Sequence, residues 1–235
     1  MNGTAAHEGA RLTATSHASG RPPPPGGGDL SPRVLVVATR SPHKLGELRA
    51  LLHLPGARLI SLDEAGVDDE APEEGDTFDE NATSKALFYA ERTGLPTLAD
   101  DSGIEVEALG GGPGVRTRRY AGDRATDAEN NAKLLEELDG LPDHARGARY
   151  RCVLALVEPG QDRPRVTIRR GTFAGRIARE PRGTGGFGYD PIFEPAWEAP
   201  GGRTVGLYSA EEKNRVSHRA AAARALRRVL LARGY

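Results

Sequence analysis

The sequence predicts an α/β fold in which a central mixed β-sheet is flanked by helices. In the first half of the chain, apolar strand-like runs alternate with helix signals, which favours parallel strands joined by helices. In the second half, two long strand-like runs are separated by a short turn, which favours an antiparallel hairpin. About 200 residues remain once a biased N-terminal stretch is set aside, which suits one α/β domain or two closely joined lobes.

The folded part begins with a strand, a tight loop and a helix. Residues 34–38 are uniformly apolar, as in a strand that is buried on both faces. Ser41 suits a helix N-cap and Pro42 the first helical position, and leucines follow at helical spacing. A second short strand is predicted at residues 58–61.

Caps and turns mark the next elements. Thr77 and Glu80 match a capping box, so a helix should run from there to about residue 92. A short strand at residues 97–99 is expected to end at Asp100, with residues 104–106 continuing it after a turn. The elements expected next are a glycine-rich loop at 110–114 and a helix at 128–138.

The C-terminal half carries the hairpin and two further helices. Strands are predicted at residues 149–157 and 165–172, on either side of a turn at Pro159-Gly160. The elements expected after them are a glycine-rich loop at 183–190, a short helix at 209–215 that opens on the capping box of Ser209 and Glu212, and a last helix from Ser217 to about residue 233.

The N-terminal stretch differs in composition from the rest of the chain. Residues 1–32 hold few large apolar side chains, so we expect a disordered extension ahead of a single domain at residues 33–235. Arg11 and Arg21, among Ser, Thr and His, leave a transit peptide as the alternative. No apolar run approaches the ~20 residues of a membrane span, and no hydrophobic signal core is present, so a cytoplasmic location without a membrane partner is expected.

Charge and cysteine content argue against a nucleic-acid-binding protein and against a role for cysteine in catalysis. The formal net charge is −1, which lacks the basic excess of a nucleic-acid-binding protein. The single cysteine, Cys152, cannot form an internal disulfide. Its apolar neighbours favour a buried strand position over a nucleophile.

The first candidate site is the junction between the first strand and the first helix. A helix N-terminus presents free N–H groups and partial positive charge, which suits a phosphate, and Lys44 adds a full charge. The alternative is an ordinary turn with a solvated lysine, and the glycine pattern of a P-loop is missing. The residues of this segment are Thr39, Arg40, Ser41, Pro42, His43 and Lys44.

The second candidate site is the acidic segment Asp100-Asp101-Ser102-Gly103, at the predicted strand end. Mg²⁺ prefers hard oxygen ligands and often bridges one or two carboxylates to substrate phosphates. An Asx-type turn is the alternative. Glu73 and Glu74 add a further carboxylate or form only a solvated acidic loop.

Aromatic and charged side chains supply two more candidate sites. Phe187 lies in the loop at 183–190, where glycines allow close approach and an aromatic ring can stack on a base. Asp190 follows as a group that can read a base edge, although a flexible hairpin loop is the alternative. Lys213, His218 and Arg219 gather around a predicted helix start, where cations are mildly unfavourable, which indicates an anionic or polar ligand. The alternative is a charged helix face.

Together these sites supply metal carboxylates, phosphate-binding cations and a stacking aromatic, which fits metal-assisted hydrolysis of a nucleoside triphosphate. In this combination and order the chain resembles the inosine triphosphate pyrophosphatase family, also called XTP/dITP diphosphatases, over about residues 33 to 233. The motifs that carry the resemblance are the segment from Thr39 to Lys44, residues 75–82 with Lys85, Ala99 to Gly103, Gly110 to Gly114, Gly183 to Asp190 with Pro191, Glu212-Lys213, and Ser217-His218-Arg219.

The resemblance implies an elongated, two-lobed α/β fold, a substrate cleft between the lobes, a homodimer and Mg²⁺ as cofactor. It implies that Asp101 is the catalytic acidic residue and a metal ligand, with Glu73 as the second metal carboxylate. The substrate contacts that it implies are Lys44 and Lys85 for the triphosphate, Phe187 for stacking on the base, and Asp190, Lys213, His218 and Arg219 for the base, sugar or phosphate. Ser102, Gly188 and Tyr189 are further expected substrate contacts. Ser41 stands where the family usually has asparagine.

The activity implied is hydrolysis of non-standard purine nucleoside triphosphates such as ITP, dITP and XTP to the monophosphate and pyrophosphate. A related pyrophosphatase for pyrimidine or methylated nucleotides is the nearest alternative. A nucleotide-binding module without turnover, and a nucleic-acid-binding protein using Arg224, Arg227 and Arg228, are alternatives from other classes.

Overall fold

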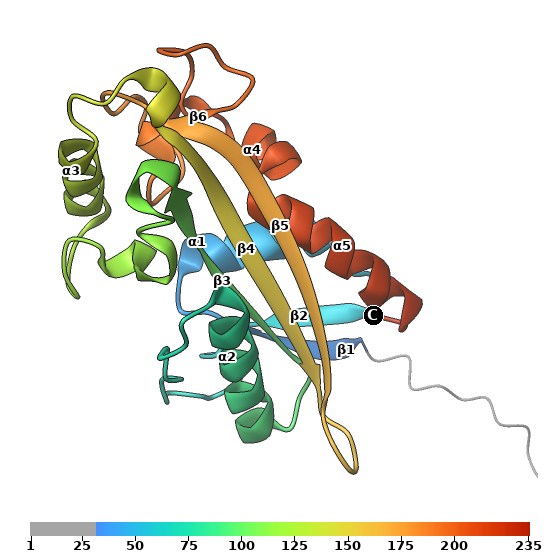
Figure 1. Cartoon of the computed structure of the whole chain (residues 1–235). Helices are drawn as coiled ribbons and strands as arrows, with labels where there is room; N and C mark the ends of the chain where they lie inside the picture. Colours follow the sequence, from blue (N-terminus) through green and yellow to red (C-terminus); the bar gives the residue numbers. More distant parts are fainter. Residues whose placement is uncertain (1–31) are drawn as a thin grey trace, which may run out of the picture. The chain divides into compact units, whose positions relative to one another are not determined.

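A six-stranded mixed sheet organises the residues that the computed structural model describes, 32–235 (Figure 1). The strand order is β2-β1-β3-β4-β5-β6, with β1 parallel to β2 and β3 and all other pairs antiparallel. The expected α/β fold with a mixed sheet is confirmed, whereas the extension expected at residues 1–32 lies outside the described residues except at Pro32. The strands are β1 (Arg33–Ala38), β2 (Ala57–Ile60), β3 (Thr97–Val106), β4 (Gly147–Glu158), β5 (Arg165–Ile177) and β6 (Phe193–Pro195).

Helices begin where the sequence places their caps. Thr77 and Ser209 cap their helices with both hydrogen bonds of a capping box, and Thr126 forms a third box. The helices are α1 (Pro42–Leu52), α2 (Phe78–Thr93), α3 (Asp127–Glu137), α4 (Ala210–Val216) and α5 (His218–Ala232), with short 3₁₀ turns between them. None of the helices in residues 32–235 has both the length and the apolar character that a membrane span requires.

The strand alternation sends successive side chains to two different cores. Leu35 and Val37 of β1 pack with α1 and α5 on one face of the sheet, whereas Val36 and Ala38 pack with α2 on the other. Because both faces are covered, the strand is apolar at every central position, as residues 34–38 indicated. A third core, which includes Tyr189, joins the far ends of β3, β4 and β5.

The largest departure from the predicted elements is in β3, which runs without a break from Thr97 to Val106. The prediction that the strand ends at Asp100 and resumes after a turn is therefore wrong. Asp100 through Gly103 stay extended because each pairs with a residue of β4, and this long-range pairing overrides their local preference for a turn. The hairpin strands β4 and β5 are also longer than predicted, because they pair with each other along their whole length.

We expect Gly171→Ala to destabilise the fold by about 1–3 kcal/mol. A methyl group on Gly171 of β5 would lie 2.1 Å from the His218 carbonyl oxygen and 2.6 Å from the Ala222 nitrogen, so helix α5 would have to move. Gly46→Ala is the matched control, since Gly46 is at an exposed position of α1 with nothing within 4 Å of the added carbon. Urea unfolding should show a gain of about 0.5–1 kcal/mol for Gly46→Ala, and equal stabilities would contradict the close packing of α5 on the sheet.

Candidate functional site

The candidate site lies where β1 ends beside the longer β3. β1 pairs with β3 only as far as Ala38 opposite Ala99, whereas β3 continues along β4. After Ala99, β1 no longer pairs with this edge of β3, and α1 begins a few residues beyond the end of β1 (Figure 1). Further along, from Ile104 to Val106, the same edge is hydrogen-bonded to the segment at residues 112–117. Because successive strand residues point to opposite faces, Asp100 faces α1 and α5 and Asp101 faces α2.

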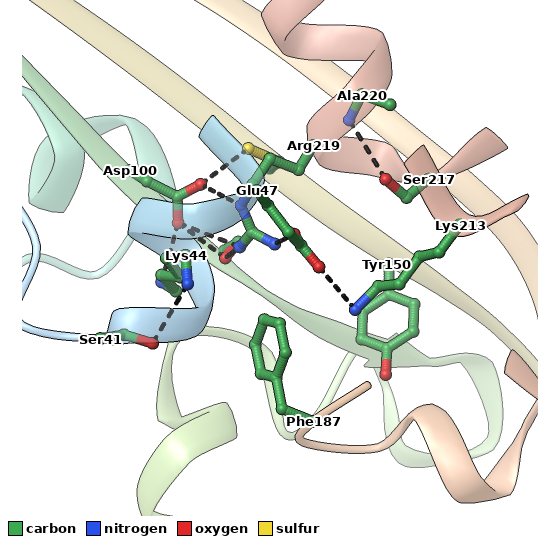
Figure 2. A network of polar contacts seen from close by, with 12 residues as sticks. Ser41, Lys44, Glu47, Asp100, Tyr150, Phe187, Lys213, Ser217, Arg219 and Ala220 are labelled. Carbon is green, nitrogen blue, oxygen red and sulfur yellow. Dashed lines mark hydrogen bonds and ion pairs between the residues drawn. The ribbon is translucent and has the colours of Figure 1, made fainter. Parts of the chain in front are cut away.

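Asp100 is fully buried and holds two cations from different helices. Its carboxylate lies 2.8 Å from Lys44 Nζ of α1 and 2.8 Å from Arg219 Nε of α5 (Figure 2). The Ser102 hydroxyl donates to it at 2.9 Å, and the buried Cys152 thiol donates at 3.3 Å. Although burial alone would raise it, the guanidinium and the ammonium hold the pKa of Asp100 well below its usual value.

A chain of alternating charges continues from this carboxylate toward the glycine-rich loop. Arg219 also donates to Glu47 of α1, and Glu47 lies 2.9 Å from Lys213 Nζ of α4. Lys213 in turn lies 2.6 Å from Asp190 Oδ2. Figure 2 shows this chain of charges from Lys44 through Asp100, Arg219 and Glu47 to Lys213. Its last member, Asp190, links α1, β3, α5 and α4 to the loop at 183–190.

Asp101, on the opposite face, lies in a different environment. One of its carboxylate oxygens, Oδ2, is buried and has no hydrogen-bond partner. Burial raises the pKa of Asp101 to about 6, with Lys85 and Lys44 opposing this rise and the negative charges of Asp100 and Glu73 adding to it. The unpartnered oxygen is a group to which a metal ion, a proton or a water molecule can bind.

Glu73 lies on the α2 side of the site. Its carboxylate forms an ion pair with Lys85 of α2, and its charge acts on Asp101. Of the two adjacent candidates, Glu73 and Glu74, the structure thus pairs Glu73 with a site lysine. The charges of the two phosphate-binding candidates, Lys44 and Lys85, both oppose the raised pKa of Asp101. Lys44 forms its ion pair with the neighbouring Asp100, and Lys85 with Glu73.

The acidic residues present fit a magnesium site. Within residues 32–235, no group of three or more His, Cys, Asp or Glu side chains is arranged to hold a metal ion. Mg²⁺ does not need such a group, because it usually keeps several waters and takes one or two carboxylates together with substrate phosphates. Asp101 offers a buried, unpartnered oxygen, and Glu73 offers the second carboxylate.

Phe187 lies at the other end of the charge chain. Its backbone N–H donates to Asp190 Oδ2 at 2.9 Å, which fixes the loop, and its ring centre is 4.2 Å from Lys213 Nζ. The His43 ring stacks on it, with centroids 5.2 Å apart and an interplanar angle of 16°. By sequence, His43 groups with the predicted phosphate-binding segment at residues 39–44. In the structure its ring instead stacks on Phe187, the aromatic residue expected to bind a base.

His218 is the second polar group at this end. Its ring stacks on Tyr150 of β4 at 4.6 Å with an interplanar angle of 8°, and its buried Nδ1 has no hydrogen-bond partner. Burial, together with the positive charges of Arg219 and Lys213, holds the pKa of His218 well below its usual value. The imidazole is therefore neutral and keeps one ring nitrogen free for a ligand.

Several of the expected binding residues contact other parts of the protein. Arg40 donates to Asp63 and to the Val67 carbonyl, and the Tyr189 hydroxyl donates to the Thr117 carbonyl. Ser41 caps the helix by accepting a hydrogen bond from the Lys44 N–H, and Thr39 accepts one from the Ser41 N–H. The Gly188 N–H donates to Asp127. Pro42 is exposed. Their placement favours positioning of the two loops over direct contact with a ligand.

The sequence reasoning missed two residues of this site. Glu47 bridges Lys213 and Arg219, and its signal was available, because it follows Lys44 by three residues and so lies on the same helix face. Tyr150 donates to Asp190 and supports His218. No local signal marks Tyr150, since it reaches the site through strand pairing.

Comparison with known proteins agrees with this architecture. The chain is similar to the dITP/XTP pyrophosphatase of Geobacter sulfurreducens, at 48% identity over 79% of this chain and 90% of that protein. It is also similar to that of Escherichia coli K12, at 45% identity over 82% of this chain and 95% of that protein. Among solved structures, a HAM1 protein from Coxiella burnetii superimposes with a TM-score of 0.76 at 44% identity, over 85% of this chain and 99% of that one.

The Staphylococcus aureus Ham1 protein gives a TM-score of 0.74 at 34% identity, over 86% of this chain and all of that one. The model of the Ham1 family matches residues 35–229. This range includes all the strands and helices described above except the first residues of β1 and the last residues of α5. Since this match spans most of the chain and the relatives are matched over most of their own length, the chain belongs to the Ham1 family.

Proposed function

We propose that this protein hydrolyses non-standard purine nucleoside triphosphates, such as ITP, dITP and XTP, to the nucleoside monophosphate and pyrophosphate. Relatives at 43–48% identity bear the name dITP/XTP pyrophosphatase. The observation that carries the proposal is the placement of the buried, unpartnered Asp101 oxygen among Lys44, Lys85 and Glu73, with the Phe187 ring at the other end of the charge chain.

Asp101 and Glu73 are the residues that would hold Mg²⁺, the cofactor that we propose. When bound, this ion would offset phosphate charge and make a water molecule more acidic. Asp101 would also accept the proton of the water that attacks the α-phosphorus, a role supported by its Oδ2, which has no other partner. Lys44 and Lys85 would hold the phosphate chain and stabilise the departing pyrophosphate.

Selectivity among purines is proposed to arise at position 6 of the base. Hypoxanthine and xanthine carry a carbonyl there, whereas adenine carries an amino group. The neutral, buried His218 and the main-chain donors near it would pair with a carbonyl and would face a second donor in adenine. A buried donor left unpaired costs about 1–3 kcal/mol.

We also infer, from the family resemblance, a homodimer that acts on the cytoplasmic nucleotide pool. Removal of unusual nucleotides from that pool is the role that such an activity would serve.

A pyrophosphate-release screen tests the proposal. We expect turnover of ITP, dITP and XTP with Mg²⁺, loss of turnover with a chelator, and recovery when Mg²⁺ is restored. The specificity constant for ITP should exceed that for ATP by at least about tenfold, which corresponds to one mismatched buried donor. Equal specificity constants for ITP and ATP would contradict the role given to position 6, and preferred release from UTP or dUTP would indicate a pyrimidine enzyme instead.

A further inference from the structure

Three side chains, Lys213, Arg219 and His43, lie over the Phe187 ring, and they differ in how firmly other contacts hold them. Lys213 lies 4.2 Å and the Arg219 guanidinium 5.7 Å from the ring centre. Both are buried and fixed by ion pairs. Lys213 pairs with Asp190 and Glu47, and Arg219 pairs with Asp100. Neither can leave the ring without breaking a buried charge pair, which is costly.

His43 differs from these two cations in both burial and fixation. It is exposed on the first turn of α1, and no hydrogen bond or ion pair ties its ring to another residue in the described range 32–235. Its ring lies nearly parallel to that of Phe187, with the centroids 5.2 Å apart. Of the three side chains over the ring, His43 is therefore the one that can move away at little cost.

We propose that His43 forms the second wall of the base site, so that a purine inserts between the His43 and Phe187 rings. This inference rests on the proposed function, because it assumes that the ligand carries a purine. A flat base between two rings needs a ring separation of about 7 Å, twice the ~3.5 Å contact distance between stacked carbons. The ring centroids are now 5.2 Å apart, so the two planes have to separate by at least about 2 Å.

The His43 side of the pair can supply this movement. Phe187 is held in its loop, because its own N–H donates to Asp190 and the Gly188 N–H donates to Asp127. The exposed His43 side chain can rotate about its own bonds while the helix that carries it stays in place. The first turn of α1 then serves both ends of a nucleotide, Lys44 at the phosphates and His43 at the base.

The experiment compares His43→Ala and His43→Phe with the wild-type enzyme, using ITP and XTP as substrates and inorganic pyrophosphate as a base-free inhibitor. Stacking contributes to binding of every base, so His43→Ala should raise KM for ITP and XTP by the same factor, at least about fivefold. kcat should stay within about twofold, because a contact made equally in ground and transition state affects KM alone. Inhibition by pyrophosphate should be unchanged, and His43→Phe should restore KM.

His144→Ala is the matched control, since His144 is exposed on a short 3₁₀ turn outside the site. An unchanged KM for ITP in His43→Ala would overturn the inference. So would a fall in KM, which would identify His43 as a plug that the base displaces, or a weakened pyrophosphate inhibition that follows KM, which would place His43 at the phosphates. Failure of the proposed function is distinguishable, because the wild-type enzyme would then release no pyrophosphate from ITP.

Discussion

Replacement of Asp101 by asparagine is expected to lower kcat for ITP by at least about 100-fold, the usual contribution of a general base. The amide has nearly the same shape as the carboxylate, but it cannot accept the proton of the attacking water and is a poor ligand for a divalent cation. The measurement is steady-state pyrophosphate release from ITP at saturating Mg²⁺.

The fold should survive this replacement. The Asp101 carboxylate is destabilised by burial, as its raised pKa indicates, so a neutral group costs the native state little. Asp162→Asn provides a control of the same chemistry at an exposed position in the turn between β4 and β5, and it should leave both rate and stability unchanged. Near wild-type turnover by Asp101→Asn would refute the catalytic assignment.

Replacement of the neighbouring acid, Asp100→Asn, is expected to have its largest effect on stability, at about 3–5 kcal/mol. The change leaves Lys44 and the fully buried Arg219 facing each other without the carboxylate that both contact at 2.8 Å. For a domain of this size, such a loss lowers Tm by roughly 6–20 °C. Chemical unfolding and calorimetry would measure it.

A double-mutant cycle separates this ion pair from general damage to the core. Arg219→Met should be strongly destabilising by itself, because it leaves Asp100 buried without its main partner. The double variant Asp100→Asn with Arg219→Met should lose less than the sum of the two single losses, since no unpaired charge remains between them. Simple additivity of the two losses would contradict the direct coupling of these side chains.

The elements that could be predicted from the sequence are those with local signals. Ser41 and Pro42 begin α1, and the capping boxes at Thr77 and Ser209 begin α2 and α4, as predicted. Such caps depend only on residues three or four apart in the chain. Ends of strands depend on distant partners, which is why the break expected at Asp100 is absent from β3.

The candidate site was likewise predictable in its residue types but not in its connections. The sequence indicates that Lys44, Asp101 and Phe187 belong to one site, and the structure brings them close to a single chain of charges. It does not indicate that Asp100 and Asp101 have separate surroundings, because this follows from which helices cover each face of the sheet. The partner of His43 also depends on a fold contact between residues 144 positions apart.

The site is assembled from two stretches of chain that are remote in sequence. The proposed hydrolytic carboxylate and phosphate-binding lysines come from residues 44–101, whereas most of the proposed base contacts come from residues 187–219, and a few ion pairs join the two stretches. Substitutions around His218 are thus expected to change which nucleobase is accepted while the proposed hydrolytic residues stay untouched. Such a division offers an evolutionary route to new nucleotide preferences, with α1 contributing to both proposed halves of the site.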